Sequence, residues 1–109
     1  MVRHITIQHV PDCPNVALAC ERLAEVLRHL GDPLVEVSTE EIADTVDASR
    51  CAFPGSPTIL FDGIDPFGTT RTTPAFACRT YRTEVGLEGA PSVDQLLAAL
   101  RAASSRGPA

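Results

Sequence analysis

The stretch that decides the fold is Val10-Pro11-Asp12-Cys13-Pro14-Asn15-Val16, where a strand pattern stops and a helix pattern starts. The run before it, from His4 to Val10, is rich in β-branched residues, which favour strands. After it, apolar residues recur at helical spacing, namely Val16, Cys20, Leu23, Leu27 and Leu30. The sequence therefore predicts a strand that is followed at once by an amphipathic helix over residues 14–30.

One cysteine lies at this junction. Pro14 suits the first helical position, where its missing N–H costs nothing, so Cys13 is expected near the N-cap. Unpaired amides and the positive end of the helix dipole favour a thiolate there. Asp12 has the opposite effect, because a neighbouring negative charge disfavours the anion. Cys13 is therefore the candidate reactive sulfur.

Length and charge limit the possible functions. The 109 residues suit a single domain, predicted over residues 1–103 with a flexible tail over 104–109. A net charge of -5 with scattered arginines argues against a nucleic-acid or anionic membrane partner. There is no long apolar run and no secretory signal pattern. The sequence predicts a cytoplasmic protein.

Four cysteines, Cys13, Cys20, Cys51 and Cys78, carry the remaining chemical signal. In a reducing compartment they favour reactive thiols or soft-metal ligands over structural disulfides. Cys20 is expected to be a small buried hydrophobe. No Cys-x-x-Cys or His-x-x-x-His spacing supports zinc, so neither a metal site nor a cofactor is predicted.

The middle of the chain continues the alternation of strands and helices. Gly31 and Pro33 end the first helix, and residues 34–37 read as a second strand, parallel to the first. Ser38-Thr39-Glu40-Glu41 has a capping-box pattern that predicts a short helix. Residues 58–61 form a nearly all-apolar run, typical of a buried strand.

The last third follows in the same way. After Asp62-Gly63 a loose loop is expected, because prolines and threonines follow. A fourth strand over residues 77–83 places Cys78 and Arg82 on one face, and Arg79 and Tyr81 on the other, at a sheet edge. A second capping box at residues 92–95 opens the final helix. The predicted fold is α/β, β-α-β-α-β-β-α, with a four-stranded mixed sheet and helices on both faces.

Two segments resemble the thioredoxin and glutaredoxin superfamily. One is Cys13-Pro14 at the start of the first helix, and the other is Gly55-Ser56-Pro57-Thr58-Ile59-Leu60-Phe61-Asp62-Gly63, which is similar to the superfamily's cis-proline segment. With Asp12-Cys13-Pro14-Asn15, Asp65-Pro66-Phe67 and Cys78-Arg79-Thr80-Tyr81, the chain is similar to small actinobacterial thioredoxin-like proteins, some labelled alkylmercury lyase-like.

This resemblance implies a cis peptide bond before Pro57, and Ser56 facing Cys13. It also implies that the substrate is bound by the backbone of the cis-proline loop, beside Asp12, Cys13 and Pro14.

The chain departs from a dithiol thioredoxin at Val16, where the second cysteine of the motif would stand. Cys20 cannot replace it, because seven residues of helix rise roughly 10 Å, beyond the reach of about 7 Å between disulfide-bonded Cα atoms. A resolving thiol must come from elsewhere. Cys78 is slightly preferred, because the resemblance includes its motif, and Cys51 is the close second.

Three interpretations follow. In the first, Cys13 is the nucleophile of a thiol-disulfide oxidoreductase that acts on a thiol or disulfide, either a small molecule or a protein. In the second, Cys13 and Cys78 hold a soft metal such as mercury, and Asp12 supplies the proton that cleaves an organomercurial. In the third, the domain has the fold but no catalytic activity. The sequence predicts no particular oligomeric state.

Overall fold

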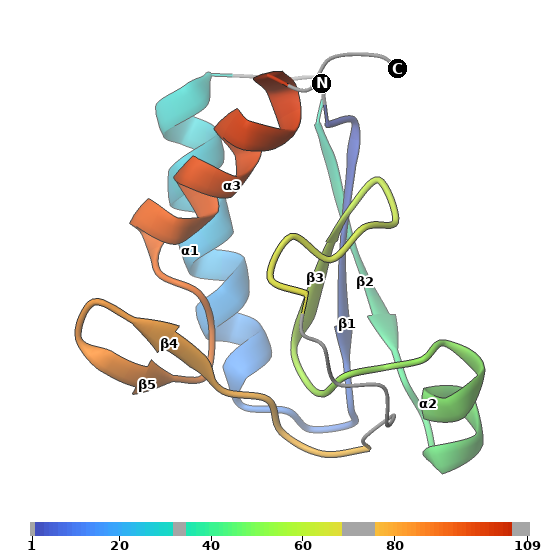
Figure 1. Cartoon of the computed structure of the whole chain (residues 1–109). Coiled ribbons are helices and arrows are strands. Elements are labelled where there is room, and N and C mark those ends of the chain that lie inside the picture. Colours follow the sequence, from blue (N-terminus) through green and yellow to red (C-terminus); the bar gives the residue numbers. More distant parts are fainter. Residues whose placement is uncertain (1, 32–34, 69–75, 106–109) are drawn as a thin grey trace.

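The computed structural model describes residues 2–31, 35–68 and 76–105 of the chain (Figure 1). Its elements in chain order are β1 (His4–His9), α1 (Asn15–Leu30), β2 (Glu36–Glu41), α2 (Thr45–Arg50), β3 (Thr58–Phe61), β4 (Tyr81–Thr83), β5 (Gly86–Glu88) and α3 (Val93–Ser105). None of the described helices is both long enough and apolar enough to cross a membrane. The chain is a mixed α/β protein, as predicted.

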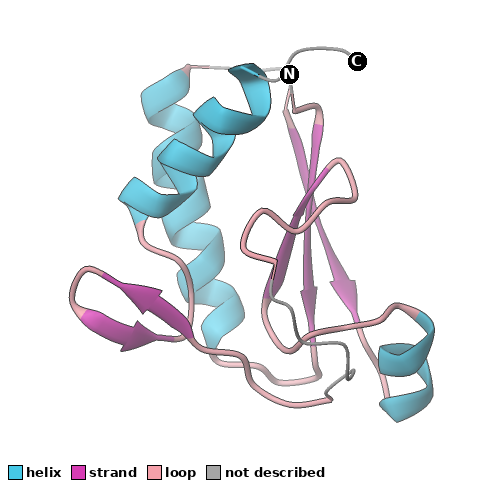
Figure 2. Cartoon of the chain, in the orientation of Figure 1, coloured by secondary structure: helices cyan, strands magenta, loops and turns pink. Residues whose placement is uncertain are grey.

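The described strands form two separate sheets (Figure 2). The first has the order β2-β1-β3, with β2 parallel and β3 antiparallel to β1. Its register places Ile5 opposite both Val37 and Phe61. β4 and β5 pair only with each other, as an antiparallel hairpin. The parallel β1-α1-β2 unit is confirmed, whereas the single four-stranded sheet is not.

The β4–β5 hairpin explains why the fourth strand leaves the sheet. β4 is three residues long and turns back at Glu84-Val85 to pair with Gly86–Glu88, where no strand was predicted. The Thr83 hydroxyl closes this turn: it accepts from the Val85 N–H at 3.3 Å, and its one proton is shared between the Gly86 carbonyl at 3.0 Å and the Glu88 carboxylate at 2.8 Å. Glu-Val is not a typical hairpin turn sequence, so the pattern gave no signal for β5.

The main core lies between the three-stranded sheet and the helix pair α1 and α3, which lie side by side on one face of that sheet (Figure 1). Its buried side chains include Ile5 and Ile7 from β1, Ile59 and Phe61 from β3, Leu23 and Val26 from α1, and Leu96 and Leu100 from α3, whereas all six residues of β2 are exposed. α2 lies beyond the end of β2 (Figure 1), where Ile42, Ala48 and Phe53 form a small second cluster against Val10. Helices on both faces of the sheet are therefore not confirmed.

The first predicted capping box is wrong. Residues 38–41 belong to β2, because their backbone pairs with β1. The short helix begins later, at Thr45, where the Asp44 side chain caps it by accepting from the Asp47 N–H at 2.9 Å. The predicted second strand, residues 34–37, corresponds to β2 only from Glu36 onward, and Leu34 lies outside the described residues.

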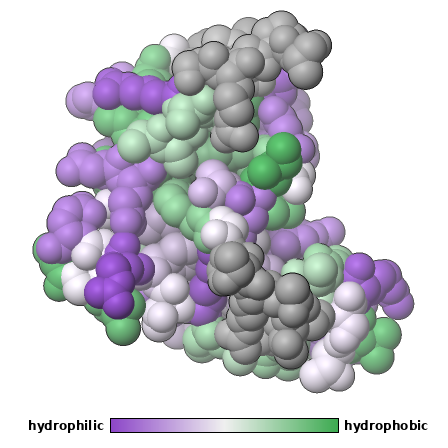
Figure 3. Space-filling view, viewed as in Figure 1, coloured by the Kyte–Doolittle hydropathy of each residue, from purple (hydrophilic) through white to green (hydrophobic). Residues whose placement is uncertain are grey.

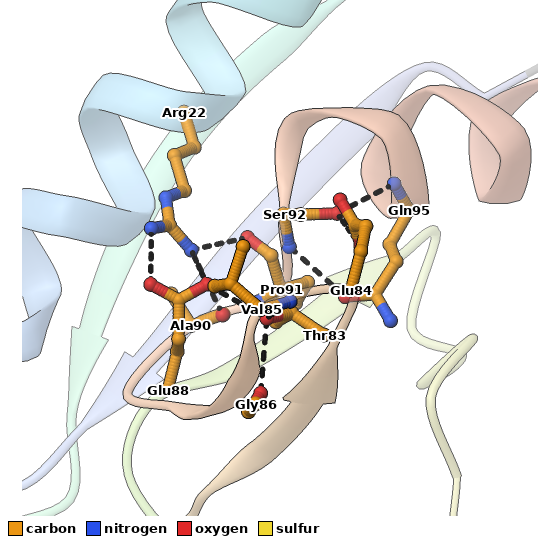
Figure 4. Close-up of polar contacts among 10 residues, drawn as sticks. All are labelled: Arg22, Thr83, Glu84, Val85, Gly86, Glu88, Ala90, Pro91, Ser92 and Gln95. Carbon is orange, nitrogen blue, oxygen red and sulfur yellow. Dashed lines mark hydrogen bonds and ion pairs between the residues drawn. The ribbon is translucent and has the colours of Figure 1, made fainter.

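The second predicted capping box is confirmed (Figure 4). The Ser92 hydroxyl accepts from the Gln95 N–H at 3.1 Å, and the Gln95 side chain accepts from the Ser92 N–H at 3.0 Å. These bonds satisfy two amides at the start of α3. The helix continues to Ser105, two residues beyond the predicted domain boundary, and residues 106–109 lie outside the described part.

The chain reversal after β3 is tighter than predicted. Phe61 and Ile64 exchange both backbone hydrogen bonds, at 2.8 and 3.0 Å, around Asp62 and Gly63. Both turn residues have positive φ, 51° and 87°, which Asp tolerates and Gly adopts freely. The expected loose loop therefore begins with a tight turn, and its residues 69–75 lie outside the described part.

Arg22 of α1 anchors the hairpin to the helices (Figure 4). Its guanidinium forms an ion pair with Glu88 at 2.8 Å and donates to the carbonyls of Ala90 and Pro91, at 3.1 and 3.2 Å. Tyr81 and Thr83 of β4 are also buried, whereas Val85 at the turn and Leu87 of β5 are exposed. Green at the lower left of Figure 3 marks this apolar hairpin surface.

Candidate functional site

Cys13 lies at the N-terminus of α1, as predicted. It is the residue immediately before the N-cap. Pro14 is the N-cap and Asn15 the first helical residue. The Cys13 side chain is half-buried, and its carbonyl accepts from the Val16 N–H at 3.4 Å. No side chain caps this helix, and its first turn contains no acidic residue. The positive end of α1 therefore lies next to Cys13, and no side chain caps its amides.

The residues on either side of Cys13 fix the turn into α1. Asp12 is exposed and has a φ of 57°, a left-handed conformation that a short polar side chain tolerates. Asn15 packs against Gly89 so closely that a Cβ at position 89 would lie 2.2 Å from the Asn15 side chain. The first helical residue of α1 thus packs directly against the loop that precedes α3.

Ser56 joins three segments of the site. The Ser56–Pro57 bond is cis, as the resemblance implied. The buried Ser56 hydroxyl accepts from the Val10 N–H at 3.1 Å, at the end of β1. Its backbone N–H donates to Ala77 and its carbonyl accepts from Arg79, both at 2.8 Å. The segment leading to Cys13 and the segment carrying Cys78 therefore meet at Ser56.

The resemblance implied that the backbone of the cis-proline loop pairs with a substrate. In this chain, residues 77–79 already pair with Ser56, in an isolated parallel bridge that places Cys78 opposite it. The Ser56 side chain is directed to Val10, three residues before Cys13. Ser56 therefore makes contacts within the chain with both its backbone and its hydroxyl.

All four cysteines lie in the described residues and are free thiols. Cys78 is exposed beside Ser56. Cys51, also exposed, is the C-cap of α2 and precedes Phe53, whose cluster packs on Val10. Cys20 packs partly buried against the main core, and this burial raises the pKa of its thiol. Cys20 was expected to be a small buried hydrophobe; it packs against the core but is only partly buried.

Arg79 organises a group of contacts that the sequence did not reveal. Its guanidinium forms an ion pair with Asp65 at 2.7 Å and lies 4.5 Å from the centre of the Tyr81 ring. The Tyr81 hydroxyl donates to the Pro57 carbonyl, and burial raises the pKa of this hydroxyl. Arg79 and Tyr81 share the inner face of their segment, as the alternation predicted. These contacts hold the segment carrying Cys78 against the cis-proline loop.

An additional signal in the sequence could have identified this group. Arg79 stands on the face that also carries a large aromatic residue, Tyr81, and a buried arginine needs a carboxylate partner. The pattern cannot say which of the 14 acidic residues supplies it, because Asp65 is 14 positions away.

Comparison of the chain with models of known families, with curated proteins and with solved structures finds no significant match to any of them. The thioredoxin-like resemblance therefore stays a prediction. Within the described residues, no three histidine, cysteine or acidic side chains are grouped so that they could hold a metal ion.

Proposed function

We propose that this protein carries out thiol-disulfide exchange, with Cys13 as the attacking thiolate and Cys78 as the thiol that resolves the mixed disulfide. The observation that carries the proposal is the position of Ser56, which bonds to Val10 on one side and pairs with residues 77–79 on the other. Two cysteine-bearing segments that lie 65 positions apart in the sequence are thereby held to one buried residue.

The pairing of Ser56 favours a resolving thiol within the chain. Its N–H and carbonyl are both used by residues 77–79, so an extended substrate cannot pair with them while that segment is in place. Cys78 is the central residue of the segment. Cys51 is the second candidate, because its helix end is linked to Val10 through Phe53.

The environment of Cys13 suits the first step. The thiolate is the nucleophile in exchange, and the uncapped amides of a helix N-terminus stabilise negative charge. The Cys13 thiolate attacks one sulfur of a small-molecule or protein disulfide, so a Cys13–substrate disulfide forms and the other half leaves as a thiolate. Cys78 then attacks the Cys13 sulfur, which releases the second substrate thiol. The substrate gains two electrons, and the protein is left with a Cys13–Cys78 disulfide.

Competitive labelling tests the first step. The reduced protein is pulsed with limiting iodoacetamide near neutral pH, and the four cysteine peptides are quantified by mass spectrometry. Cys13 should be labelled faster than Cys51 and Cys78, although both of these are more exposed. Equal rates at the three sites would contradict the proposal, and labelling in denaturant provides the control.

Disulfide mapping tests the second step. After oxidation with a limiting small disulfide, a Cys13–Cys78 crosslink is expected. Cys13→Ser should abolish the release of both substrate thiols and formation of the intramolecular disulfide, and Cys78→Ser should trap the mixed disulfide at Cys13. The matched control is Cys20→Ala, which removes a thiol packed against the core and should leave exchange unchanged. If Cys13→Ser retained full turnover, the proposed role of Cys13 would be wrong.

A further inference from the structure

Cys78, the proposed resolving thiol, also lines a cavity. The cavity has a volume of about 450 Å³ and lies where the segment leading into β4 meets the loop after β3. This volume is in the range of pockets that bind small molecules. Its described lining includes Cys78, Arg79, Tyr81 and Arg82 together with Phe67.

The charge of this cavity is opposite to that of the whole protein. The chain has a net charge of -5, yet the described lining residues include two arginines and no acidic residue. Arg79 is neutralised by Asp65 at 2.7 Å. Arg82 is exposed and has no ion pair among the described residues. The Arg82 guanidinium is therefore available to an anionic ligand.

A second cavity offers a comparison within the same molecule. It has a volume of about 290 Å³ and is lined by Cys51 and Asp65, with no arginine among its described lining residues. The two cavities adjoin at Pro54 and Gly68, which line both. Within the described part of the chain, the protein thus presents two exposed cysteines, one in a cavity that contains the unpaired Arg82 and the other in a cavity whose one charged lining residue, Asp65, is already paired with Arg79.

We propose that the cavity at Cys78 binds small disulfides that carry carboxylate groups, with Arg82 holding a carboxylate while Cys78 exchanges with the disulfide. The Cys78 thiolate attacks one sulfur, the substrate S–S bond breaks, and a Cys78–substrate disulfide forms as the other half leaves as a thiolate. Cys78 is oxidised and the disulfide reduced, so no further reactant is needed. The proposal goes beyond the reaction at Cys13 and does not depend on it.

Two probes of matched size test the charge selectivity. Dithiodipropionate carries two carboxylates, and cystamine carries two ammonium groups on the same spacing. The full-length reduced protein is treated with each, and mixed disulfides at Cys78 and Cys51 are quantified by peptide mapping. Dithiodipropionate should form more mixed disulfide at Cys78 than at Cys51, whereas cystamine should show no preference for Cys78. High salt should weaken the preference of dithiodipropionate, because salt screens the charge on Arg82. An equal ratio of the two sites with both probes would overturn the proposal.

Substitution at Arg82 tests the residue itself. Arg82→Gln should slow the reaction of Cys78 with dithiodipropionate by about fivefold, the effect of one charge pair near contact in water, and should not slow the reaction with cystamine. Arg82→Lys should restore most of the rate. The control Arg101→Gln removes an exposed arginine on α3 that is not among the residues lining the cavity, and should change nothing.

A loss of rate with both probes in Arg82→Gln would show a structural role instead and would overturn the proposal. Repeating the measurement in Cys13→Ser separates the two proposals, because the preference for carboxylates at Cys78 should survive there.

Discussion

Ser56 and Cys78 lie opposite each other in an isolated parallel bridge, in which both backbone polar groups of Ser56 pair with the neighbours of Cys78. The bridge fixes the thiol-bearing segment to the residue that precedes the cis bond. It is supported on one side by Arg79, whose side chain reaches Asp65 and Tyr81.

Gly55 is required where the two segments approach. Its φ is 135°, and a Cβ at this position would lie 2.8 Å from the Cβ of Arg79. Gly55→Ala should destabilise the fold by about 2–5 kcal/mol, from backbone strain and overpacking together. Gly63→Ala is the control, because Gly63 also has positive φ but open space around it, so only strain of about 1–2 kcal/mol is expected. Denaturant unfolding measures both, and equal losses would contradict the close approach.

The pair between Arg79 and Asp65 is mostly buried, with side-chain exposures of 10% and 17%. Arg79→Met should cost about 3–5 kcal/mol, because it leaves a buried carboxylate without its partner. Arg50→Met is the matched control, since the Arg50–Asp47 pair is exposed and 3.5 Å long, and should cost under about 1 kcal/mol. Similar losses for the two variants in denaturant unfolding would argue against a structural role of Arg79.

The Glu88 carboxylate should make the anchoring of the hairpin depend on pH. Hydrogen bonds from Arg22 and Thr83 lower the pKa of Glu88 below its ordinary value of 4.5. Because the folded-state pKa is the lower one, the stabilisation is full above the unfolded value and is lost as the pH falls through the folded value. The Tm difference between the wild type and Glu88→Gln should therefore be present near neutral pH and shrink below about pH 4.5.

Glu25→Gln provides the control for this experiment. Glu25 is an exposed residue of α1 with no ion pair among the described residues, so its Tm difference from the wild type should not narrow in acid. A constant difference for Glu88→Gln across the same pH range would show that the ion pair with Arg22 contributes nothing.

Cys20 should be the least reactive thiol. Burial raises the pKa of its thiol, so a smaller fraction is thiolate near neutral pH. Its alkylation rate should be well below that of Cys51, which is exposed. The difference should disappear in denaturant, where both side chains meet water. Fast labelling of Cys20 in the folded protein would mean that α1 opens at this position.

Elements that depend on a few neighbouring residues could be predicted from local sequence patterns. The helix that starts behind Cys13-Pro14 depends on a proline, an apolar period and a closing glycine, and it was predicted almost to the residue. The capping box at Ser92 also depends on side chains only three positions apart. By contrast, the capping box at residues 38–41 was overridden, because pairing with β1 gave those backbone groups a different set of partners.

The sequence by itself determined the α/β class, the parallel β1-α1-β2 unit and the position of Cys13 before a helix, since all three follow from local propensity and periodicity. Only the tertiary structure decided that β4 turns away to pair with β5, and that Ser56 pairs with the segment carrying Cys78. The tertiary structure also decided which carboxylate pairs with Arg79, namely that of Asp65. The physical reason is that each of the last two contacts joins residues 14 or more positions apart, and the hairpin turn at Glu84-Val85 lacks the residues that normally mark one. Whether such pairs meet depends on the packing of the whole chain.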